Sequence, residues 1–446
     1  MAGTWQNWSG QVSCTPASVE YPESELAAAA LITAKRDQGN VPVRPVGAGH
    51  SFNDLCATTG TLIDPGRMNR VLGIDTATGR VRVQAGITLR DLTESLASAG
   101  LALRHSGGAY DQQLGGSLAT GTHGTGTTSA SLSAQVRSVR LVTADGTVRE
   151  AAAPASTSED SDFFNAAVLG LGALGLVTEV ELETVPAFRL HRVQTPRILD
   201  SLMPELLDRV AATDHTEIFL FPYTRRALLL EATRTDAPAQ RENPLRLWFE
   251  RDILESTALG SMLRIAATKP KVAPLVSQGI AALANSGERI DDSTKLSIPA
   301  ARVRYTEMEY AIPIPRVIEA IERILAVIQV RRLPVASPIE VRFAAADTAL
   351  LSPASGGPVA YVAVHQYVGL PWEDYFAAAE SILLELGGRP HWGKRHSLTA
   401  RDFAASVPGW DAFGRVRAHV DPDGIFSGEY LQRILGPVPS LPGGRP

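Results

Sequence analysis

Arg44-Pro45-Val46-Gly47-Ala48-Gly49-His50-Ser51 is the stretch on which the interpretation of this chain depends. It overlaps the end of a short apolar run, Val41–Val46, that is typical of a strand. Glycines directly after a strand let the backbone approach a ligand closely and present successive N–H groups to a phosphate. A Rossmann loop would need a third glycine where Phe52 stands, followed by a helix, and it has neither. The alternatives are a phosphate-binding turn and a tight turn with a buried histidine.

A second glycine-rich segment, Gly115 to Thr128, has the sequence GGSLATGTHGTGTT. Small and hydroxyl-bearing residues predict a backbone that wraps a flat polar ligand closely. The alternative is a flexible surface linker. Leu118 and His123 interrupt the segment, and strand patterns such as Val136–Thr143 lie nearby, so the linker is the weaker interpretation.

A third segment, Gly170-Leu171-Gly172-Ala173-Leu174-Gly175, matches the pattern G-x-G-x-x-G. The dinucleotide fingerprint requires a strand before the glycines and a helix after them. Here Ser161–Leu169 has a helical pattern and Leu176–Val185 has a strand pattern. This order argues against a nicotinamide site and leaves close helix–strand packing or the lining of another cofactor.

Charged residues gather in two later segments. Gly387 to Lys394 brings Arg389, His391, Trp392 and Lys394 together, as in either a site or a solvated loop. Glu340 and Arg342 are two residues apart, so on a strand they point to the same face. By themselves they are equally consistent with an ion pair on a solvated strand face. The chain has no G-x-S-x-G elbow, which disfavours a hydrolase of that type.

Length and charge exclude several classes of protein. The 446 residues predict about two to three domains. A net charge of -5 leaves no electrostatic footprint for nucleic acid or an anionic membrane surface. No apolar run is long enough for a membrane span, and the spacing of Cys14 and Cys56 predicts neither a zinc nor an iron–sulfur site. Without a secretory signal pattern, the cytoplasm is the expected location.

Taken together, five motifs in order resemble the vanillyl-alcohol oxidase superfamily. Within it, the chain is similar to the aldonolactone oxidoreductases (L-gulono-1,4-lactone oxidase or dehydrogenase) and to the alditol oxidases. The motifs are Arg44–Ser51, Ala119–Gly126, Leu171–Gly175, Glu340–Phe343 and Arg389–Lys394. The resemblance covers nearly the whole chain.

The resemblance implies an α+β fold of two domains. An FAD-binding domain is expected over residues 1–186, and a substrate domain built on a large antiparallel sheet over residues 187–395. Residues 396–446, including Asp421–Phe426, are expected to return to the FAD domain. Within the second domain, Thr235–Asn243 is predicted to be a surface loop, and the tail from Pro439 to Pro446 is predicted to be disordered.

By resemblance, His50 binds the 8α-methyl carbon of FAD covalently. A second, cysteine-mediated link is not expected because His105–Tyr110 contains no cysteine. The other residues implied to contact the cofactor come from the three glycine-rich segments and the start of the strand that follows the third one. They are Arg44, Gly47, Ala48, Gly49, Ser51, Gly107, Gly116, Ser117, Thr120, Gly121, Thr122, His123, Gly126, Gly175 and Val177. No metal is expected.

The implied reaction is the oxidation of a sugar-derived alcohol by hydride transfer to flavin N5. Arg342 and Lys394 are the candidates for stabilising negative charge that develops on the flavin. Glu340 is expected to bind substrate hydroxyls and to assist proton removal. His365 and Tyr367, which share one strand face, and His391 are expected to line the sugar pocket.

Two positions bear on the substrate and the electron acceptor. Tyr367 and Gly108 stand where the resemblance predicts small hydroxyl side chains in an alditol oxidase, which favours an aldono-1,4-lactone such as L-gulono-1,4-lactone over a polyol. Gly107 falls on a position that admits dioxygen in this superfamily when it is glycine. The expected acceptor is therefore O2, which yields H2O2, with another acceptor as the alternative. A non-enzymatic carbohydrate-binding protein would leave the flavin motifs unexplained.

Overall fold

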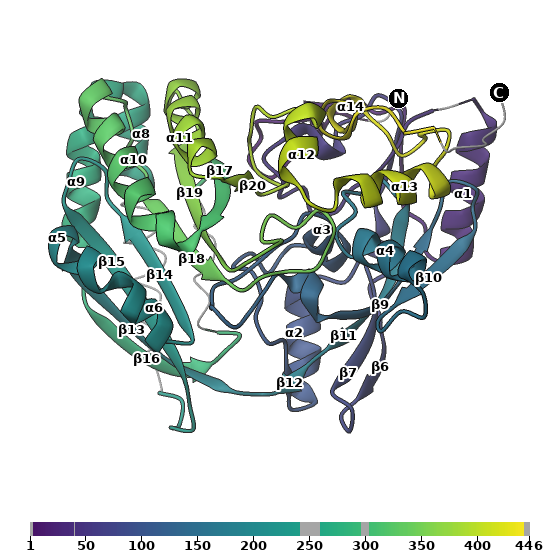
Figure 1. The fold of residues 1–446 in the computed structure, drawn as a ribbon, viewed down its shortest axis with the longest axis horizontal. Helices are drawn as coiled ribbons and strands as arrows, with labels where there is room; N and C mark the ends of the chain where they lie inside the picture. The colour runs from purple at the N-terminus through teal and green to yellow at the C-terminus, as the bar shows by residue number, and fades with distance from the viewer. Residues whose placement is uncertain (1–2, 40, 241–258, 296–302, 441–446) are drawn as a thin grey trace.

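The computed structural model describes residues 3–39, 41–240, 259–295 and 303–440. These residues form two lobes that lie next to each other. The first lobe contains the N-terminal part of the chain, and the second contains the large sheet with its helices (Figure 1). The last helices lie over the first lobe, near the N-terminus. The α+β fold with a large antiparallel sheet is confirmed. The predicted loop from Thr235 and the predicted disordered tail lie partly outside the described residues.

The first lobe holds a five-stranded antiparallel sheet of order β10-β9-β11-β7-β6 and a three-stranded parallel sheet of order β3-β5-β4. Its strands are β1 (Trp5–Gln6), β2 (Ser13–Cys14), β3 (Ser18–Glu20), β4 (Val43–Pro45), β5 (Thr61–Ile63), β6 (Val71–Asp75), β7 (Arg80–Gln84), β8 (Leu101–Ala102), β9 (Val136–Val142), β10 (Val148–Ala152), β11 (Leu176–Glu183) and β12 (Val185–Pro186). Its helices are α1 (Glu25–Asp37), α2 (Leu89–Ser98), α3 (Leu114–Ala119) and α4 (Ser158–Ala167). Buried and half-buried residues alternate strictly along β11, as expected for a strand with one face toward the core.

The second lobe is built on an eight-stranded sheet of order β16-β13-β15-β14-β18-β19-β17-β20, in which every pairing is antiparallel. Its strands are β13 (Arg189–Ile198), β14 (His215–Leu220), β15 (Arg226–Thr235), β16 (Gly287–Asp292), β17 (Tyr305–Pro313), β18 (Ile339–Ala344), β19 (Val359–Tyr367) and β20 (Arg389–Pro390). Its helices are α5 (Leu199–Leu202), α6 (Leu206–Ala212), α8 (Leu259–Thr268), α9 (Ala273–Leu283), α10 (Val317–Arg331) and α11 (Glu373–Glu385). Residues from α5, α6, α10 and α11 form one apolar core with the sheet residues that point toward them.

The C-terminal segment packs on the first lobe through α12 (Ala400–Ser406), α13 (Trp410–Val420) and α14 (Glu429–Leu435). Ile425 and Phe426 share a core with Val43 and Ile63, and the Val43 N–H donates to the Ile425 carbonyl at 2.7 Å. Trp392 also belongs to the main core of the first lobe, although it lies within the range expected for the second. The first lobe is therefore assembled from two distant parts of the chain, the N-terminal part and the segment from Trp392 onward.

The order around Gly170–Gly175 is α4, then the glycines, then β11. This is the reverse of the Rossmann order and confirms the prediction made from the sequence. Gly175 has φ +144°, and a Cβ there would lie 2.3 Å from the Val142 carbonyl oxygen, so the position requires glycine. In contrast, helix α3 was not predicted, since its composition of LGGSLA suggests a loop. Its buried Leu114 and Leu118 anchor it to the core.

Arg44 acts as a buried clamp for the first lobe. Its guanidinium donates to the carbonyl oxygens of Leu55 (3.1 Å), Leu171 (2.8 Å), Gly172 (3.0 Å) and Phe426 (2.5 Å). Burial lowers the pKa of this guanidinium to about 10, so the group remains charged at neutral pH. One side chain therefore joins three segments that are far apart in the sequence.

Replacing Arg44 by methionine is expected to lower the free energy of unfolding by about 3 kcal/mol or more, because several buried carbonyls lose a charged donor. The midpoint of urea denaturation measures the loss. Arg67, an exposed arginine that pairs with Glu23 at 2.7 Å, provides the control, because Arg67→Met should change stability by less than about 0.5 kcal/mol. Equal midpoints for the two variants would contradict the clamp.

Among the described residues, no helix is both long and apolar enough to cross a membrane.

Candidate active site

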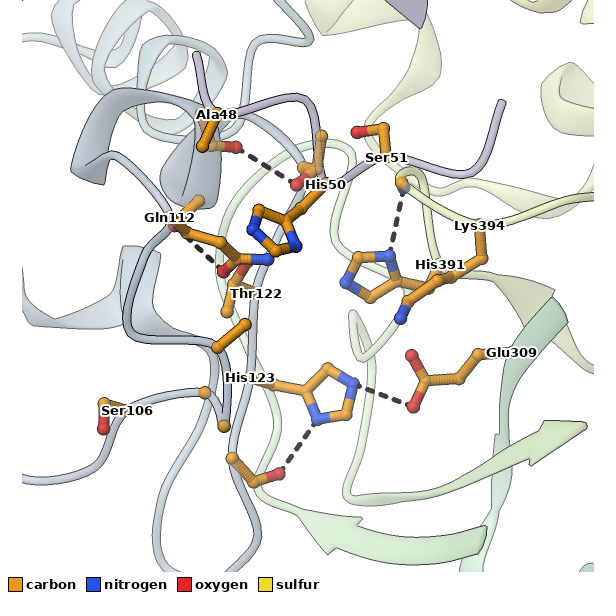
Figure 2. A pocket seen from close by; sticks show the side chains of 18 of the residues that line it. Ala48, His50, Ser51, Ser106, Gln112, Thr122, His123, Glu309, His391 and Lys394 are labelled. Carbon is orange, nitrogen blue, oxygen red and sulfur yellow. Dashed lines mark hydrogen bonds and ion pairs between the residues drawn. The ribbon is translucent and has the colours of Figure 1, made fainter. Parts of the chain in front are cut away.

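A cavity of about 870 Å³ lies between the two lobes and is lined by all of the glycine-rich segments and by the face of the large sheet. From the first lobe it receives the loop that contains His50, the segments around Gly107 and Thr122, and residues 170–177. From the second it receives side chains of β13, β14, β15, β17, β18 and β19. Figure 2 shows His50 and Thr122 approaching the cavity from one side and Glu309 and Lys394 from the other. The arrangement can enclose an elongated ligand between the lobes.

The loop after β4 fits the phosphate of a nucleotide cofactor. Among the described residues, the N–H groups of Gly47, Ala48 and His50 donate to no other backbone group, and all three residues line the cavity. Gly49 has φ +70°, which turns the chain at this point. Successive free N–H groups in such a turn form an anion-binding concavity. The residues present therefore fit the pyrophosphate of FAD.

His50 lies at the end of this loop and lines the cavity. Burial lowers the pKa of its imidazole, and Lys394 lowers it further against the opposing effect of Asp111. A neutral ring has a free nitrogen lone pair at neutral pH, which is what a nucleophile requires.

The second glycine-rich segment presents polar groups to the same cavity. Gly116 is open, since nothing lies within 4 Å of the position a Cβ would occupy. The buried side-chain oxygen of Gln113 has no hydrogen-bond partner within the part of the chain that the structure describes. This oxygen lies beside the loop after β4, 2.8 Å from the position of a Cβ added at Gly47, and an unpaired buried acceptor there fits a ligand that supplies an N–H or O–H group. Ser117, Thr120, Thr122 and His123 line the cavity beside them.

Most of the residues predicted to contact the cofactor line this cavity, including Ser51, Gly107, Gly175 and Val177. Gly121 and Gly126 do not. Gly121 packs toward Leu169, and the Gly126 N–H donates to the Phe343 carbonyl at 2.6 Å, so Gly126 connects the two lobes. Arg44 lines the cavity, but its guanidinium is occupied by backbone carbonyls, as described above.

The catalytic candidates share one face of the large sheet because side chains alternate along each strand. Glu340 and Arg342 on β18 are buried or half-buried on the cavity side, whereas Ile339, Val341 and Phe343 point into the helical core. The strand register places Glu217 of β14 opposite Arg342. It likewise places Glu307 of β17 opposite His365 of β19. Four adjacent strands thus deliver charged side chains to one patch.

Arg342 joins two carboxylates. Its Nε donates to Glu217 at 2.7 Å, and its Nη2 contacts Glu340. Burial, together with the charge of Glu217, raises the pKa of Glu340 well above its usual value despite Arg342. Burial also disfavours the charged form of Glu217, but the charge of Arg342 and the hydrogen bonds with Glu340 and Arg342 together lower the pKa of that carboxyl. The surroundings therefore shift Glu340 toward its neutral form and Glu217 toward its charged form, and Arg342 keeps its charge.

His365 and Lys394 flank Glu307. Lys394 Nζ donates to Glu307 at 2.5 Å, and His365 Nε2 lies 3.6 Å from Glu307 and 3.7 Å from Glu340. Burial lowers the pKa of His365 in spite of the nearby Glu307, so its ring is neutral at physiological pH. His365 Nδ1 lies 3.2 Å from the Pro338 carbonyl and carries the proton, which leaves Nε2 as an acceptor toward the cavity. Tyr367 also lines the cavity, two residues along the same strand.

His123 forms a second polar cluster with Glu309 and His391 (Figure 2). Its Nδ1 faces the Gly124 carbonyl at 2.9 Å, and its Nε2 faces Glu309 at 3.3 Å. Burial opposes ionisation of Glu309, but His123, together with Lys394 and His391, holds the pKa of this carboxyl well below its usual range. Burial lowers the pKa of His391 to about 3, and its Nδ1 accepts the Gly393 N–H at 3.0 Å. His123 thus bridges the Gly124 carbonyl and Glu309, and its ring also contacts that of His391, with centroids 5.6 Å apart.

Three carboxylates of the site were missed from the sequence: the half-buried Glu217 and the buried Glu307 and Glu309. Glu307 and Glu309 stand two apart in Tyr305–Pro313, an otherwise largely apolar strand. Glu217 begins the apolar run Glu217–Phe221. Acidic residues that alternate with the core-facing residues of a largely apolar strand were the available signal, since such groups are rarely buried without partners.

Comparison with known proteins agrees with this arrangement. Residues 180–434 match the family model described as D-arabinono-1,4-lactone oxidase, and residues 16–152 match an FAD binding domain. The chain is 41% identical to an L-gulono-1,4-lactone dehydrogenase of Mycobacterium tuberculosis over 98% of this chain and 100% of that protein. It is 32% identical to an L-gulonolactone oxidase of Bos taurus over 97% of this chain and 98% of that protein.

Solved structures show the same fold at lower sequence identity. A cholesterol oxidase from B. sterolicum has a TM-score of 0.82 and 18% identity and covers 97% of this chain and 96% of its own. A solvent-stable cholesterol oxidase has a TM-score of 0.80 and 20% identity, with coverage of 96% of both chains. The chain thus shares the fold of these two cholesterol oxidases. With a match that spans more than half of its length, this chain belongs to the D-arabinono-1,4-lactone oxidase family.

Proposed function

We propose that this FAD-dependent oxidoreductase oxidises a CH–OH group of an aldono-1,4-lactone such as L-gulono-1,4-lactone. The observation that carries the proposal is the single cavity in which the flavin-binding loops face Glu340, Arg342, His365 and Lys394. The names of the relatives support the lactone. The departures at Tyr367 and Gly108 favour it over a polyol.

When bound, FAD supplies the two-electron acceptor for the hydride of the carbinol carbon. The remaining roles belong to the chain. Arg342 presents a fixed positive charge, held in place by Glu217 and Glu340, toward the centre of the cavity. Glu340, on the same face of the sheet, binds a hydroxyl group of the lactone. His365 Nε2 accepts the proton of the oxidised hydroxyl, because it is neutral and its Nδ1 is already engaged.

His50 is proposed to carry FAD covalently, supported by its position in the cavity and its neutral ring. Gly47, Ala48, Gly49 and Ser51 would hold the pyrophosphate through their backbone, with the Gly116–His123 segment along the rest of the cofactor. The cytoplasm remains the proposed compartment, in keeping with two cysteines that are both free thiols.

A panel of lactones and polyols tests the substrate. The purified yellow protein is mixed anaerobically with each compound, and bleaching of the flavin band is followed. L-gulono-1,4-lactone and other aldono-1,4-lactones should bleach the band much faster than sorbitol or xylitol. Faster bleaching by the polyols would assign the enzyme as an alditol oxidase, and no bleaching by either class would refute both assignments.

Gly107 is proposed to control the electron acceptor. Its φ lies outside the left-handed region, so the backbone does not require glycine, but an added Cβ would lie 2.6 Å from Thr122 Cγ2. We expect the unmodified enzyme to be reoxidised by O2 with formation of H2O2, and Gly107→Ala to slow this step about 10-fold or more by closing the space beside the flavin. Stopped-flow mixing of the substrate-reduced enzyme with air-saturated buffer measures the rate.

Thr122→Ser, combined with Gly107→Ala, provides the control for this prediction, because it removes the methyl group that the added Cβ would meet. If the double variant remains slow, the new methyl itself excludes oxygen. Recovery in the double variant would assign the effect to displacement of Thr122. If the unmodified and Gly107→Ala enzymes are both reoxidised slowly, over minutes, the protein is a dehydrogenase. That result would contradict the proposed role of Gly107.

A further inference from the structure

The N-terminal hairpin, defined here as residues 5–14, is built directly on the two residues that flank His50. Its strands β1 and β2 pair antiparallel, with Trp5 opposite Cys14. The Trp8 N–H donates to the Gly49 carbonyl at 2.8 Å, and the Asn7 side chain donates to the Ser51 carbonyl at 2.9 Å. The hairpin therefore holds the chain on both sides of the histidine.

Asn7 makes this hairpin rigid. Its side chain is 5% exposed, and its oxygen accepts hydrogen bonds from the N–H groups of Gln11 and Val12, each at 3.1 Å. The Trp5 ring packs against Gly49, where a Cβ would come within 3.1 Å of it. A single buried amide thus connects the turn of the hairpin to the loop of His50.

Trp8 also contacts the imidazole itself. The indole and the His50 ring stack with their centroids 5.5 Å apart and their planes 21° from parallel. His50 lines the cavity, whereas Trp8 does not, so the indole supports the ring from outside the cavity. The indole is held in turn by edge contacts with Phe52 (6.2 Å) and Tyr305 (5.4 Å).

We propose that Trp8 is a positioning residue for covalent flavin attachment: its stacked indole fixes the plane of the His50 imidazole so that a ring nitrogen faces the cavity. The proposal rests on the proposed covalent bond to His50. A nucleophile must be held in a narrow range of approach directions, and a small misplacement can cost up to about 100-fold in rate. A free imidazole on an otherwise mobile χ2 torsion would lack this restraint.

The attachment step needs only the flavin, the histidine and an oxidant to balance in bonds and electrons. A bond forms between an imidazole nitrogen and the 8α carbon, and the N–H bond of the ring and one C–H bond of the 8-methyl group break. The two electrons and two protons released reside on the flavin, which is thereby reduced. Dioxygen in the air-saturated incubation then removes them and is reduced to H2O2. Trp8 takes no part in these bonds and acts only on the orientation of the nucleophile.

The alternative is that Trp8 only packs in the first lobe. In that case its replacement would lower stability without a selective effect on attachment. The variants Trp8→Leu and Trp8→Phe separate the two roles, because leucine keeps apolar volume and phenylalanine keeps a planar ring. Trp5→Leu is the matched control, since Trp5 belongs to the same hairpin and packs on the same loop at Gly49. If Trp8→Leu does not fold, Trp8→Met gives the same comparison.

The experiment follows covalent incorporation of flavin in the full chain. Protein produced under riboflavin limitation is incubated with excess FAD in air, and samples are denatured in acid and scored by flavin fluorescence on a denaturing gel. Thermal stability is measured in parallel. We expect Trp8→Leu to incorporate flavin about 10-fold more slowly than the unmodified chain, and Trp8→Phe and Trp5→Leu to remain within about 3-fold.

Incorporation by Trp8→Leu at the unmodified rate would overturn the inference, and so would equal slowing in all of the variants in proportion to lost stability. A wild-type chain that never retains flavin after denaturation would refute the covalent bond itself, and this inference with it. If the covalent bond is absent, no variant retains flavin after denaturation. If only the role of Trp8 is wrong, all variants retain it at the same rate.

Discussion

Replacing Arg342 by alanine is expected to slow flavin reduction by the lactone roughly 10²–10³-fold, which corresponds to about 3–4 kcal/mol of lost transition-state stabilisation. Negative charge develops on the flavin only as the hydride arrives, so the contact with a fixed guanidinium strengthens in the transition state. Arg342 is suited to this role because Glu217 and Glu340 hold it in a half-buried position and keep it charged. The loss should therefore appear mainly in the reduction rate and only weakly in the apparent affinity for the lactone.

Stopped-flow reduction under anaerobic conditions measures this rate. Arg225 provides a matched control, because it also joins two carboxylates, Asp200 at 2.5 Å and Glu322 at 2.7 Å, but on the surface of the second lobe. Arg225→Ala should leave the reduction rate unchanged. A reduction rate for Arg342→Ala within a few-fold of normal would remove Arg342 from the catalytic machinery.

Replacing His50 by alanine is expected to abolish covalent flavin attachment completely. The unmodified protein should remain yellow after acid precipitation, whereas His50→Ala should release all of its FAD into the supernatant. The physical reason is that His50 offers a neutral ring nitrogen at the edge of the cavity, next to the loop that fits the pyrophosphate. Absorbance of the washed pellet and of the supernatant at the flavin band gives the two fractions.

His105 is the appropriate control for this experiment, since it also lines the cavity and burial lowers the pKa of its ring to about 3. His105→Ala should keep its flavin in the pellet. Free FAD in the supernatant of the unmodified protein would contradict attachment altogether, and release from His105→Ala alone would transfer the role to His105.

Some of the site could be predicted from the sequence because the information is local. A glycine pair after a strand, as in Gly47-Ala48-Gly49, signals a close backbone approach wherever the chain folds. The two-residue spacing of Glu340 and Arg342 places them on one face of any strand. The order of helix, glycines and strand around Gly170–Gly175 is enough to exclude a Rossmann loop, because that order is written in the local hydrophobic pattern.

Other features depend on distant partners. The sequence showed Arg44 as part of a cofactor loop, but its guanidinium holds carbonyls of residues as far away as Phe426. Gly121 and Gly126 share the composition of their cavity-lining neighbours, yet they pack toward Leu169 and Phe343. A glycine-rich sequence shows that the backbone can make a close contact, but it does not show whether the partner is a ligand or another part of the protein.

The sequence by itself determined the α+β class, the order of the flavin-binding segments and the identity of His50, Glu340, Arg342 and Lys394 as candidates. Only the tertiary structure decided which carboxylates complete the site, because Glu217, Glu307 and Glu309 reach it through the register of a sheet whose neighbouring strands are distant in sequence. It also brought Trp8 onto His50, although the two residues are far apart along the chain. The alternation of side chains along one strand can be recognised within that segment of sequence. Which strands pair, and in which register, depends on the burial of the apolar face of the whole sheet, and no single segment contains that information.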